Sequence, residues 1–559
     1  LIQQESAYSD VDAISVDWGI EYYLHEKEIV NLIDTLGSAG GGREFYGESL
    51  SASANTLNIA FPTQFVRKGL DLSCYVAAAA TSSVASTMTA KIAGSTAKLS
   101  FPAIPSSNFY KKAEVANVLV KTITNSTGEQ SLLLTYQVDN SAATARLNYV
   151  ELNVPVDLVM RGNALAITNT EYLNESEMLS FTLTGANQNV QIWRVTDGVN
   201  ITQMPTQNSN GVLRWIGSNE QAEQYMAVDV RATGWKRPEY VGVVKNQNLH
   251  ALRDKDYVII CPAEFMEPAI RLAKKHEEID HLTWAVVTDE QVYNEFSSGT
   301  PDVTAYRWLM KMLYDRAGAN KIQQPKNLLL MGNASFDNRN LLGEQSGVSR
   351  ILVYEAYNST DETKAYATDD YCGFLTDSAG IIYNGIFDDT YATMDIGVGR
   401  LPLRTLSQAE QVVNKLCTYM DDRVLGKWKN QICFLADDGD GGMHVEGADE
   451  GAEVLRKQNL DFVVNKIYLD AYTQEVNASG ERYPTVKNQF DNMISNGVLF
   501  MNYSGHGGYN NITNELFMTT NDIRKMGNSN QAFWFLATCG FAHFDARIPS
   551  AAEEAVLNP

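Results

Sequence analysis

Long apolar runs are missing from this sequence. None of its 559 residues belongs to an uninterrupted apolar stretch of about 18 or more, so no segment is expected to cross a membrane as a helix. Basic residues are outnumbered, with 44 Lys and Arg against 67 Asp and Glu and a formal net charge of −23. This balance argues against a nucleic-acid partner, because phosphates require a basic surface.

Cysteine and histidine are both scarce. The six cysteines are widely scattered without a CxxC pair, which excludes a dense disulfide framework but neither requires nor excludes an oxidising compartment. Cys261 and Cys433 lie in apolar runs and are interpreted as buried small hydrophobes. The seven histidines are few enough that each one in a polar loop is worth testing for a chemical role.

Apolar residues are nevertheless plentiful. The hydrophobic fraction of 44%, with 10% aromatics, is ample for buried cores, and the length predicts about three domains. The chain begins at Leu1 without a methionine and stops soon after an expected helix. We therefore expect a processed chain or a piece of a longer protein, in which a lost export signal would leave no trace.

The N-terminal part of the sequence has the pattern of β-strands. Residues 1 to about 245 carry short alternating segments such as "TLNIAFP", "SLLLTYQV" and "VQIWRV", separated by turn residues. Period-two alternation of this kind is typical of antiparallel β-sandwiches. We expect a β-sandwich-like domain over residues 1–160 and a second small β domain over residues 161–245. No chemistry-bearing cluster occurs there, so a structural or partner-binding role is favoured.

From about residue 246 the pattern changes to strands alternating with helices. The β-rich runs "DYVIICP", "TWAVVT" and "NLLLMG" are separated by amphipathic helical segments, and a second round begins at "QICFLADDGDGG". Such alternation predicts parallel sheets. We expect an α/β subdomain over residues 246–425 and a catalytic α/β subdomain over residues 426–559, truncated at its C-terminal end.

Three polar loops follow predicted strands of this last subdomain. One holds Asp437 and Asp438, one holds His506 in "SGHGG", and one holds Cys539 in "ATCG". In open parallel sheets, sites form where strands end at their carboxyl edges, so these loops are expected to converge. A nearby imidazole lowers a thiol pKa and later protonates the leaving amine, and glycine-flanked amides can stabilise an oxyanion.

Other interpretations of these residues stay open. His506 could be a turn histidine and Cys539 a buried residue at a strand end. A zinc site of Cys539, His543 and His506 is geometrically possible but lacks a second cysteine. Asp438 and Asp440 have the opening spacing of a calcium loop, but the following residues exclude an EF-hand. A looser calcium site or a solvated turn remains.

The chain resembles the gingipain-type cysteine peptidases of family C25, which share a caspase-like fold, and among them the surface sortases of the type IX secretion system. The motifs "DIGVGRLPLRT", "FLADDGDGGMH", "MNYSGHGG" and "ATCGFAHFD" carry the resemblance, which covers about residues 250–559. The His and Cys elements are 33 positions apart (539 minus 506), as in this family. The fold implied is multidomain, with an N-terminal all-β region followed by a caspase-like α/β catalytic region of two subdomains with parallel sheets.

The resemblance also implies roles for residues. Cys539 would be the nucleophile and His506 the general base and acid, with the amides of Gly507 and Cys539 as the oxyanion hole. The third member would be Asp437, with Asp438 as the alternative. No cofactor is required. The acid that gives gingipains their Arg or Lys specificity is not placed in this sequence, although Asp440 is nearby.

The function implied is that of a cysteine endopeptidase and transpeptidase. It would remove C-terminal secretion signal domains from cargo proteins through a thioester acyl-enzyme and join the new carboxyl end to lipopolysaccharide. Its partners would be such cargo and an outer-membrane β-barrel of the secretion system. The protein would be exported to the outer membrane or cell surface of a Gram-negative bacterium. The alternatives are a secreted gingipain-like protease that only hydrolyses and a catalytically silent scaffold of the same fold.

Overall fold

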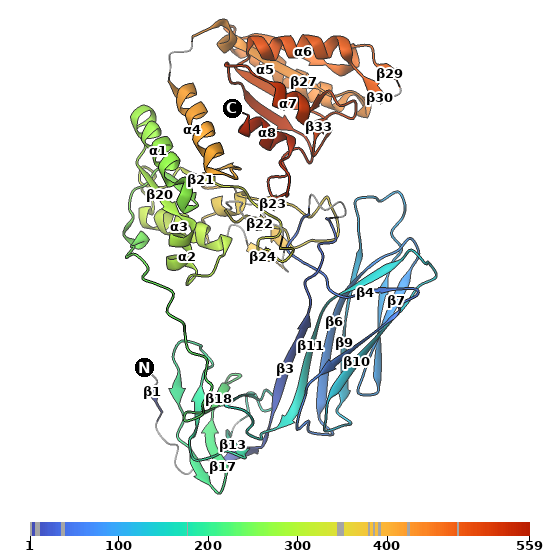
Figure 1. Ribbon diagram of the computed structural model, residues 1–559, viewed down its shortest axis with the longest axis vertical. Helices are drawn as coiled ribbons and strands as arrows, with labels where there is room; N and C mark the ends of the chain where they lie inside the picture. Colours follow the sequence, from blue (N-terminus) through green and yellow to red (C-terminus); the bar gives the residue numbers. More distant parts are fainter. Residues whose placement is uncertain are drawn as a thin grey trace. The chain divides into compact units, whose positions relative to one another are not determined.

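β-Strands make up most of the N-terminal part of the protein in the computed structural model. The structure describes residues 3–5, 12–34, 40–175, 177–343, 351–377, 381–383, 386–388, 393–421, 425–477 and 480–558. The chain divides into one unit with Leu1–Leu32 and Phe45–Val244, and a second with Ile33–Glu44 and Lys245–Pro559. The elements labelled as α-helices in Figure 1 all belong to the second unit. Each unit is described below by itself.

The larger β-sandwich of the first unit consists of two antiparallel sheets. One has the order β3-β11-β6-β9, with β4 beside β11, and the other has the order β5-β10-β7-β8. The strands are β3 (Trp18–Glu26), β4 (Ser49–Ser51), β5 (Thr56–Phe61), β6 (Asp71–Thr81), β7 (Ser86–Ile92), β8 (Ser95–Phe101), β9 (Glu114–Ile123), β10 (Gln130–Gln137) and β11 (Thr144–Asp157).

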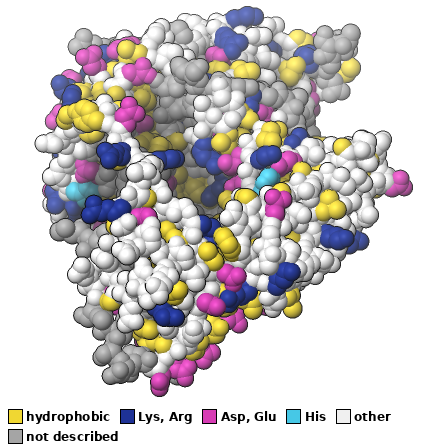
Figure 2. Space-filling view, turned by 60° about the horizontal axis from the view of Figure 1, so that its bottom comes forward, with side chains coloured by type: hydrophobic (Ala, Val, Ile, Leu, Met, Phe, Trp, Pro, Cys, Tyr) yellow, Lys and Arg dark blue, Asp and Glu magenta, His cyan; other side chains and the backbone are white. Residues whose placement is uncertain are grey.

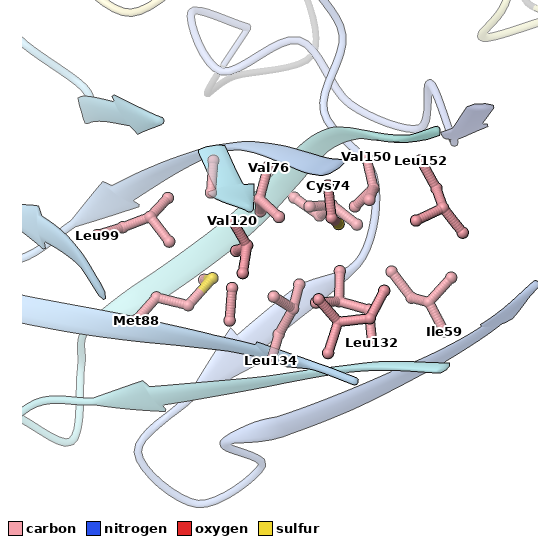
Figure 3. Packing of buried hydrophobic residues seen from close by; sticks show 14 of the residues in the cluster. Ile59, Cys74, Val76, Met88, Leu99, Val120, Leu132, Leu134, Val150 and Leu152 are labelled. Carbon is pink, nitrogen blue, oxygen red and sulfur yellow. The ribbon is translucent and has the colours of Figure 1, made fainter. Parts of the chain in front are cut away.

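The core of this sandwich follows from the alternation in its strands. In β10, Leu132 and Leu134 are fully buried whereas Leu133 between them is 38% exposed, as a pleated strand with one face inward requires. Figure 3 shows Val76 and Val150 of one sheet pointing toward residues of the other sheet across the core. The predicted β-sandwich architecture is therefore confirmed.

A second, smaller sandwich in the first unit includes the N-terminal strands. Its sheets have the orders β1-β15-β14-β18-β12 and β16-β17-β13-β2. The strands are β1 (Gln3–Gln4), β2 (Ala13–Val16), β12 (Ala164–Thr168), β13 (Met178–Thr184), β14 (Val190–Arg194), β15 (Thr202–Gln203), β16 (Gln207–Ser209), β17 (Val212–Gly217) and β18 (Gln224–Asp229).

The start of the chain thus departs from the predicted domain limits. Strand β2 lies inside the predicted domain of residues 1–160 but pairs in parallel with β13, and Val16 is buried in the core of the smaller sandwich. Residues 33–44 also group with the second unit. A strand of four residues shows no pattern that identifies its partner, because the partner is chosen by tertiary packing.

The first sheet of the second unit is parallel and covered on both faces. Its order is β20-β19-β21-β26, and the alternating residues of β19 enter two different hydrophobic clusters. Val258 and Ile260 pack with α2 and α3, whereas Ile259 and Cys261 pack with α1 and α4. The elements are β19 (Tyr257–Cys261), α1 (Met266–Asp280), β20 (Trp284–Thr288), α2 (Asp289–Phe296), α3 (Val303–Ala317), β21 (Asn327–Met331), β26 (Gly397–Leu401) and α4 (Leu406–Met420).

The second sheet repeats this arrangement. Its order is β28-β27-β31-β35, all parallel. Ile432 and Phe434 of β27 pack with α5, whereas Cys433 and Leu435 pack with α6. The elements are β27 (Gln431–Ala436), α5 (Met443–Gln458), β28 (Val463–Tyr468), α6 (Pro484–Asn496), β31 (Phe500–Ser504), α7 (Thr520–Lys525), β35 (Phe533–Ala537) and α8 (Ala551–Leu557). The predicted pair of parallel sheets is confirmed.

Short strands complete the second unit. Within the described part of this unit, they form three small antiparallel pairs and one three-stranded sheet. They are β22 (Tyr354–Glu355) with β23 (Ala367–Thr368), β24 (Ile381–Tyr383) with β25 (Ile386–Asp388), β29 (Glu475–Asn477) with β30 (Gly480–Arg482), and β32 (Gly507–Gly508), β33 (Asn511–Ile512) and β34 (Met518–Thr519).

The surface of the molecule mixes charged and hydrophobic side chains. Figure 2 shows hydrophobic side chains scattered among acidic and basic ones on the face drawn, which is usual for folded proteins. Across the described residues, the helices are too short or too polar to cross a membrane.

Candidate active site

The three predicted loops leave one edge of the second parallel sheet. The last residues of β27, β31 and β35 are aligned in one row, formed by Ala436, Ser504 and Ala537. The amide of Asp437 donates to the Ser504 carbonyl at 3.0 Å, and the amide of Gly505 donates to the Ala537 carbonyl at 3.2 Å. The loops of Asp437, His506 and Cys539 therefore start side by side, as the sequence predicted.

Cys539 is accessible at this edge. It is the exposed member of the six cysteines, whereas Cys74, Cys261, Cys372 and Cys433 are buried and Cys417 is partly buried. Burial raises the pKa of Cys261 to about 12 and that of Cys433 to about 12, which makes these thiols inert near neutral pH. The interpretation of Cys539 as a buried strand-end residue is therefore wrong.

Gly507 lets the histidine loop approach the cysteine loop. A methyl group added at Gly507 would lie 2.3 Å from Thr538 Oγ1 and 3.0 Å from the carbonyl oxygen of Cys539. No side chain fits in that space, since real Cβ atoms do not come so close to other heavy atoms. Glycine is needed here for the close approach of two backbones.

The pairing of β32 leaves the amide of Gly507 available. The Thr513 amide donates to the His506 carbonyl at 2.9 Å, and Gly507 lies opposite Ile512. Hydrogen-bonded and non-bonded pairs alternate along an antiparallel ladder, so Gly507 occupies a non-bonded position and its N–H points away from β33. This orientation is compatible with the predicted oxyanion role of that amide.

The imidazole of His506 is held by Asp440. The ring Nε2 lies 2.6 Å from Asp440 Oδ2, and both side chains are about half exposed. An ionised carboxylate only accepts hydrogen bonds, so Nε2 carries the proton and Nδ1 is the basic nitrogen of the neutral ring. The hydrogen bond from His506 lowers the pKa of Asp440 below its ordinary value, which keeps this carboxylate charged.

A left-handed loop brings Asp440 to this position. Four consecutive residues, Gly439 to Gly442, have positive φ values, and Asp440 itself has φ 45°. Glycine adopts this conformation without steric cost, and aspartate tolerates it better than most residues. The loop reverses the chain after β27, and helix α5 then begins at Met443.

Asp437 contacts the backbone of His506. Its Oδ2 accepts from the His506 amide at 2.9 Å, and the Tyr503 hydroxyl lies 3.4 Å from the same oxygen and 2.5 Å from the His506 carbonyl. A methyl group at Gly505 would lie 2.3 Å from Asp437 Cβ, so the fit is tight. Burial raises the pKa of Asp437 to about 6. In this structure Asp437 positions the loop, while Asp440 contacts the ring.

The difference from the expected acid has a simple origin. Asp437 follows β27 immediately and is 2% exposed, so its carboxylate contacts the His506 amide and the Tyr503 hydroxyl of the neighbouring strand end. Asp440 is three residues further along and reaches the ring through the left-handed loop. Asp438, the alternative, accepts a hydrogen bond from the Tyr483 hydroxyl at 2.8 Å. The catalytic roles of these acids stay predictions.

Two groups of possible metal ligands lie at this edge. Asp437, Asp438 and Glu515 form one, and Asp440, His444 and His506 form the other, with the ligand atoms of each group within 4.8 Å of one another. The predicted calcium ligands Asp438 and Asp440 therefore belong to different groups. Among the described residues, the groups that could hold a metal do not join Cys539 and His543 with His506.

Sequence reasoning missed several residues of the site. His444 belongs to a motif quoted from the sequence, but no role was predicted for it; it lies four residues after Asp440, as the second residue of helix α5. Its ring lies perpendicular to that of His506, with centroids 5.3 Å apart. Glu515 and Tyr503 carried no signal in the sequence, because they reach the site through tertiary packing.

Comparison with known proteins agrees with this geometry. The model of peptidase family C25 matches residues 250–559, which include all three loops. The chain belongs to peptidase family C25. Its predicted place among the gingipain-type cysteine peptidases is thereby confirmed.

Solved structures extend the likeness of this C25 chain beyond the peptidase region. The crystal structure of dimeric latent PorU from Porphyromonas gingivalis matches with a TM-score of 0.64 and 27% identity, over 76% of this chain and 40% of that chain. The chain is therefore similar to PorU, and it spans 40% of the length of the PorU chain.

Gingipain structures match less closely. The complex of RgpB pro- and mature domains from Porphyromonas gingivalis has a TM-score of 0.38 and 14% identity, over 54% of this chain and 60% of that chain. The Arg-specific cysteine proteinase gingipain R has the same TM-score and identity, over 55% and 59%. No curated protein matches the chain.

Proposed function

We propose that this C25 chain is a cysteine endopeptidase of the sortase type. It cleaves C-terminal secretion signal domains from cargo proteins and transfers the new carboxyl end to an amine of lipopolysaccharide. The observation that carries the proposal is the arrangement of an exposed cysteine, a carboxylate-held histidine and a glycine amide at one sheet edge. Similarity to PorU supports the sortase branch over a digestive protease.

The chemistry would begin at Cys539. Its thiol gives the proton to Nδ1 of His506, and the thiolate attacks the carbonyl carbon of the scissile peptide bond. The carbonyl π electrons move to the oxygen, and this oxyanion accepts hydrogen bonds from the amides of Gly507 and Cys539. The intermediate collapses to a thioester, and the leaving amine takes its proton from the His506 imidazolium.

Asp440 has two tasks in this scheme. It keeps the proton on Nε2 of the neutral ring, so that Nδ1 can accept the thiol proton, and its charge stabilises the imidazolium that forms. Asp437 holds the backbone of the same residue, so the ring cannot drift from the cysteine loop. One acid positions the loop and the other positions the ring.

The second half of the reaction decides between transfer and hydrolysis. An acceptor amine attacks the thioester, gives a proton to His506, and forms an amide as the Cys539 thiolate leaves and is reprotonated. Water in the same position yields a free carboxylate. Cargo, lipopolysaccharide and an outer-membrane β-barrel are the partners proposed, with the protein at the outer membrane or cell surface of a Gram-negative bacterium.

Mass spectrometry of processed cargo tests this function. A cargo protein with its C-terminal signal domain is incubated with the chain and an amine acceptor, with Cys539→Ala and Cys417→Ala variants in parallel. We expect the product to carry the acceptor in the wild type and in Cys417→Ala, and no processing in Cys539→Ala. A product that has gained only water would replace the proposal with a hydrolysing protease. Unprocessed cargo together with an unreactive Cys539 thiol would indicate a silent scaffold.

We also propose a structural calcium ion at the carboxylate group of Asp437, Asp438 and Glu515. Asp437 and Glu515 are buried, and Glu515 Oε2 has no hydrogen-bond partner among the described residues. Three converging carboxylates suit a hard cation with oxygen ligands, and an ion would neutralise the charges that burial disfavours. The ion would fix the loop that holds the His506 amide.

Thermal unfolding tests the calcium site. Millimolar Ca²⁺ should raise the Tm of the chelator-treated chain by several degrees, because a ligand that binds only the folded state stabilises it. Glu515→Gln should lose most of this increase, whereas Glu446→Gln, an exposed acid on α5, should keep it. Equal calcium responses in the wild type and Glu515→Gln would rule out the site.

A further inference from the structure

Asp440, His444 and His506 come together on the solvent side of the sheet edge. Asp440 Oδ2 lies 2.6 Å from His506 Nε2 and 3.3 Å from His444 Nε2, and all three ligand atoms fall within 4.8 Å of one another. We infer that these side chains form a binding site for Zn²⁺ or a similar divalent transition-metal ion, which switches the peptidase off. The inhibitory effect rests on the proposed function, whereas the metal site does not.

The position of His444 supports the presence of a metal ion at this site in the loaded protein. Its Nε2 is buried, and its 3.3 Å contact with Asp440 Oδ2 is a long ion pair that does not meet strict hydrogen-bond geometry, while its ring also faces that of His506. Buried polar atoms are almost always satisfied, so such a nitrogen calls for an explanation. A metal ion between the three atoms would use this lone pair.

Two of the three distances between ligand atoms are close to those of a zinc site. Zinc binds imidazole nitrogen and carboxylate oxygen at about 2.0–2.2 Å, which sets neighbouring ligand atoms of a tetrahedron about 3.3 Å apart. The His444–Asp440 separation already has this value. The His506–Asp440 separation must widen from its hydrogen-bond length, and both side chains are about half exposed and free to move by that amount.

The donor set selects the class of metal. Two imidazoles and one carboxylate suit zinc, copper, nickel or iron, whereas calcium and magnesium prefer oxygen ligands alone. Three protein ligands also leave one position of a tetrahedral zinc ion open for water. The site is chemically distinct from the carboxylate group of Asp437, Asp438 and Glu515, which shares none of its members.

A bound ion would remove the base of the proposed reaction. The metal occupies Nε2 of His506, and the proton of a neutral imidazole must then reside on Nδ1. Nδ1 can no longer accept the thiol proton, and Asp440 becomes a metal ligand instead of the partner of Nε2–H. Removal of the ion restores the original tautomer, so the inhibition is reversible.

Zinc titration calorimetry tests the site without using activity. The parent protein is the full chain with Cys539→Ala, which removes the exposed thiol as a competing ligand, in a buffer saturated with Ca²⁺ to occupy the carboxylate group. We expect one equivalent of Zn²⁺ to bind in the micromolar range. His444→Gln and Asp440→Asn should each weaken binding at least about 10-fold, as even indirect changes at zinc sites do.

The matched control is the second His–Asp pair with helical spacing. His276 Nδ1 lies 2.7 Å from Asp280 Oδ2 on α1. Among the described residues, this pair does not belong to a group of three side chains that could hold a metal ion. His276→Gln should bind zinc as tightly as the parent. Absence of binding in the parent, or unchanged affinity in both His444→Gln and Asp440→Asn, would overturn the inference.

Inhibition of the wild-type chain is a separate measurement. Zn²⁺ should abolish cargo processing at concentrations that match the calorimetric affinity, and a chelator should restore it. A chain that binds zinc through these residues but never processes cargo would disprove the proposed function and leave the metal site standing. A chain that processes cargo at full rate with zinc bound would disprove the switch.

Discussion

Replacement of Cys539 by alanine should lower turnover by at least about three orders of magnitude while the fold persists. Removal of the nucleophile of a catalytic triad leaves only the catalysis due to binding and the oxyanion hole. The side chain is exposed, so its truncation creates no cavity in the core. The measurement is kcat/KM for cargo or a peptide substrate, together with a thermal unfolding curve.

The control for this prediction is a cysteine away from the sheet edge. Cys417 lies on α4 and is partly buried. Cys417→Ala should retain wild-type turnover. Cargo processing by Cys539→Ala at a rate within 10-fold of the wild type would show that another group attacks the peptide bond.

Asp440→Asn should lower kcat by about 10²-fold, and Asp437→Asn should have a smaller effect on kcat. In Asp440→Asn, an amide no longer fixes the proton on Nε2 or stabilises the imidazolium, and in a related triad a substitution of this type costs up to about 10⁴-fold. The exposure of Asp440 places the expected loss below that limit. Asp437→Asn can still accept from the His506 amide through its carbonyl oxygen. Kinetics of both variants, with His506→Ala as the reference for full loss, provide the comparison.

The opposite ranking of kcat in these two variants would show that Asp437, and not Asp440, supports the His506 ring during catalysis. If Asp437→Asn matched His506→Ala while Asp440→Asn retained wild-type kcat, the ring contact in this structure would have no catalytic role. Asp437 is buried and Asp440 is exposed, so substitution of Asp437 is the one more able to destabilise the fold. A thermal unfolding curve of each variant therefore separates a catalytic effect from loss of the folded state.

Most of the candidate site could be predicted from local sequence patterns. A parallel sheet places the carboxyl ends of its strands on one edge, so three polar loops after three apolar runs had to converge. The aligned row of strand ends confirms this, and the exposure of Cys539 distinguishes it from the cysteines inside the runs. The glycines around His506 also predicted a close approach of two backbones. In the structure, the backbone of Gly507 lies close to that of the Cys539 loop.

Local sequence patterns did not predict which aspartate contacts the His506 ring and which contacts its backbone. Asp437, Asp438 and Asp440 lie within four residues, and spacing alone does not tell which carboxylate reaches a ring. The choice depends on the four left-handed residues after β27, a backbone path whose direction is set by packing at the sheet edge. Glu515 and His444 likewise join the site from other elements.

The sequence by itself determined the order of strands and helices, the residues that face the cores, and the cysteine and histidine at the strand ends. These features follow from periodicity and from the geometry of parallel sheets, both of which are local. The tertiary structure alone decided that β2 pairs with a strand far along the chain and that Asp440 holds the ring while Asp437 holds the backbone. It also decided that His444 completes a possible metal site. Those outcomes depend on contacts between segments distant in sequence, where distances of a few ångströms choose among chemically equivalent side chains.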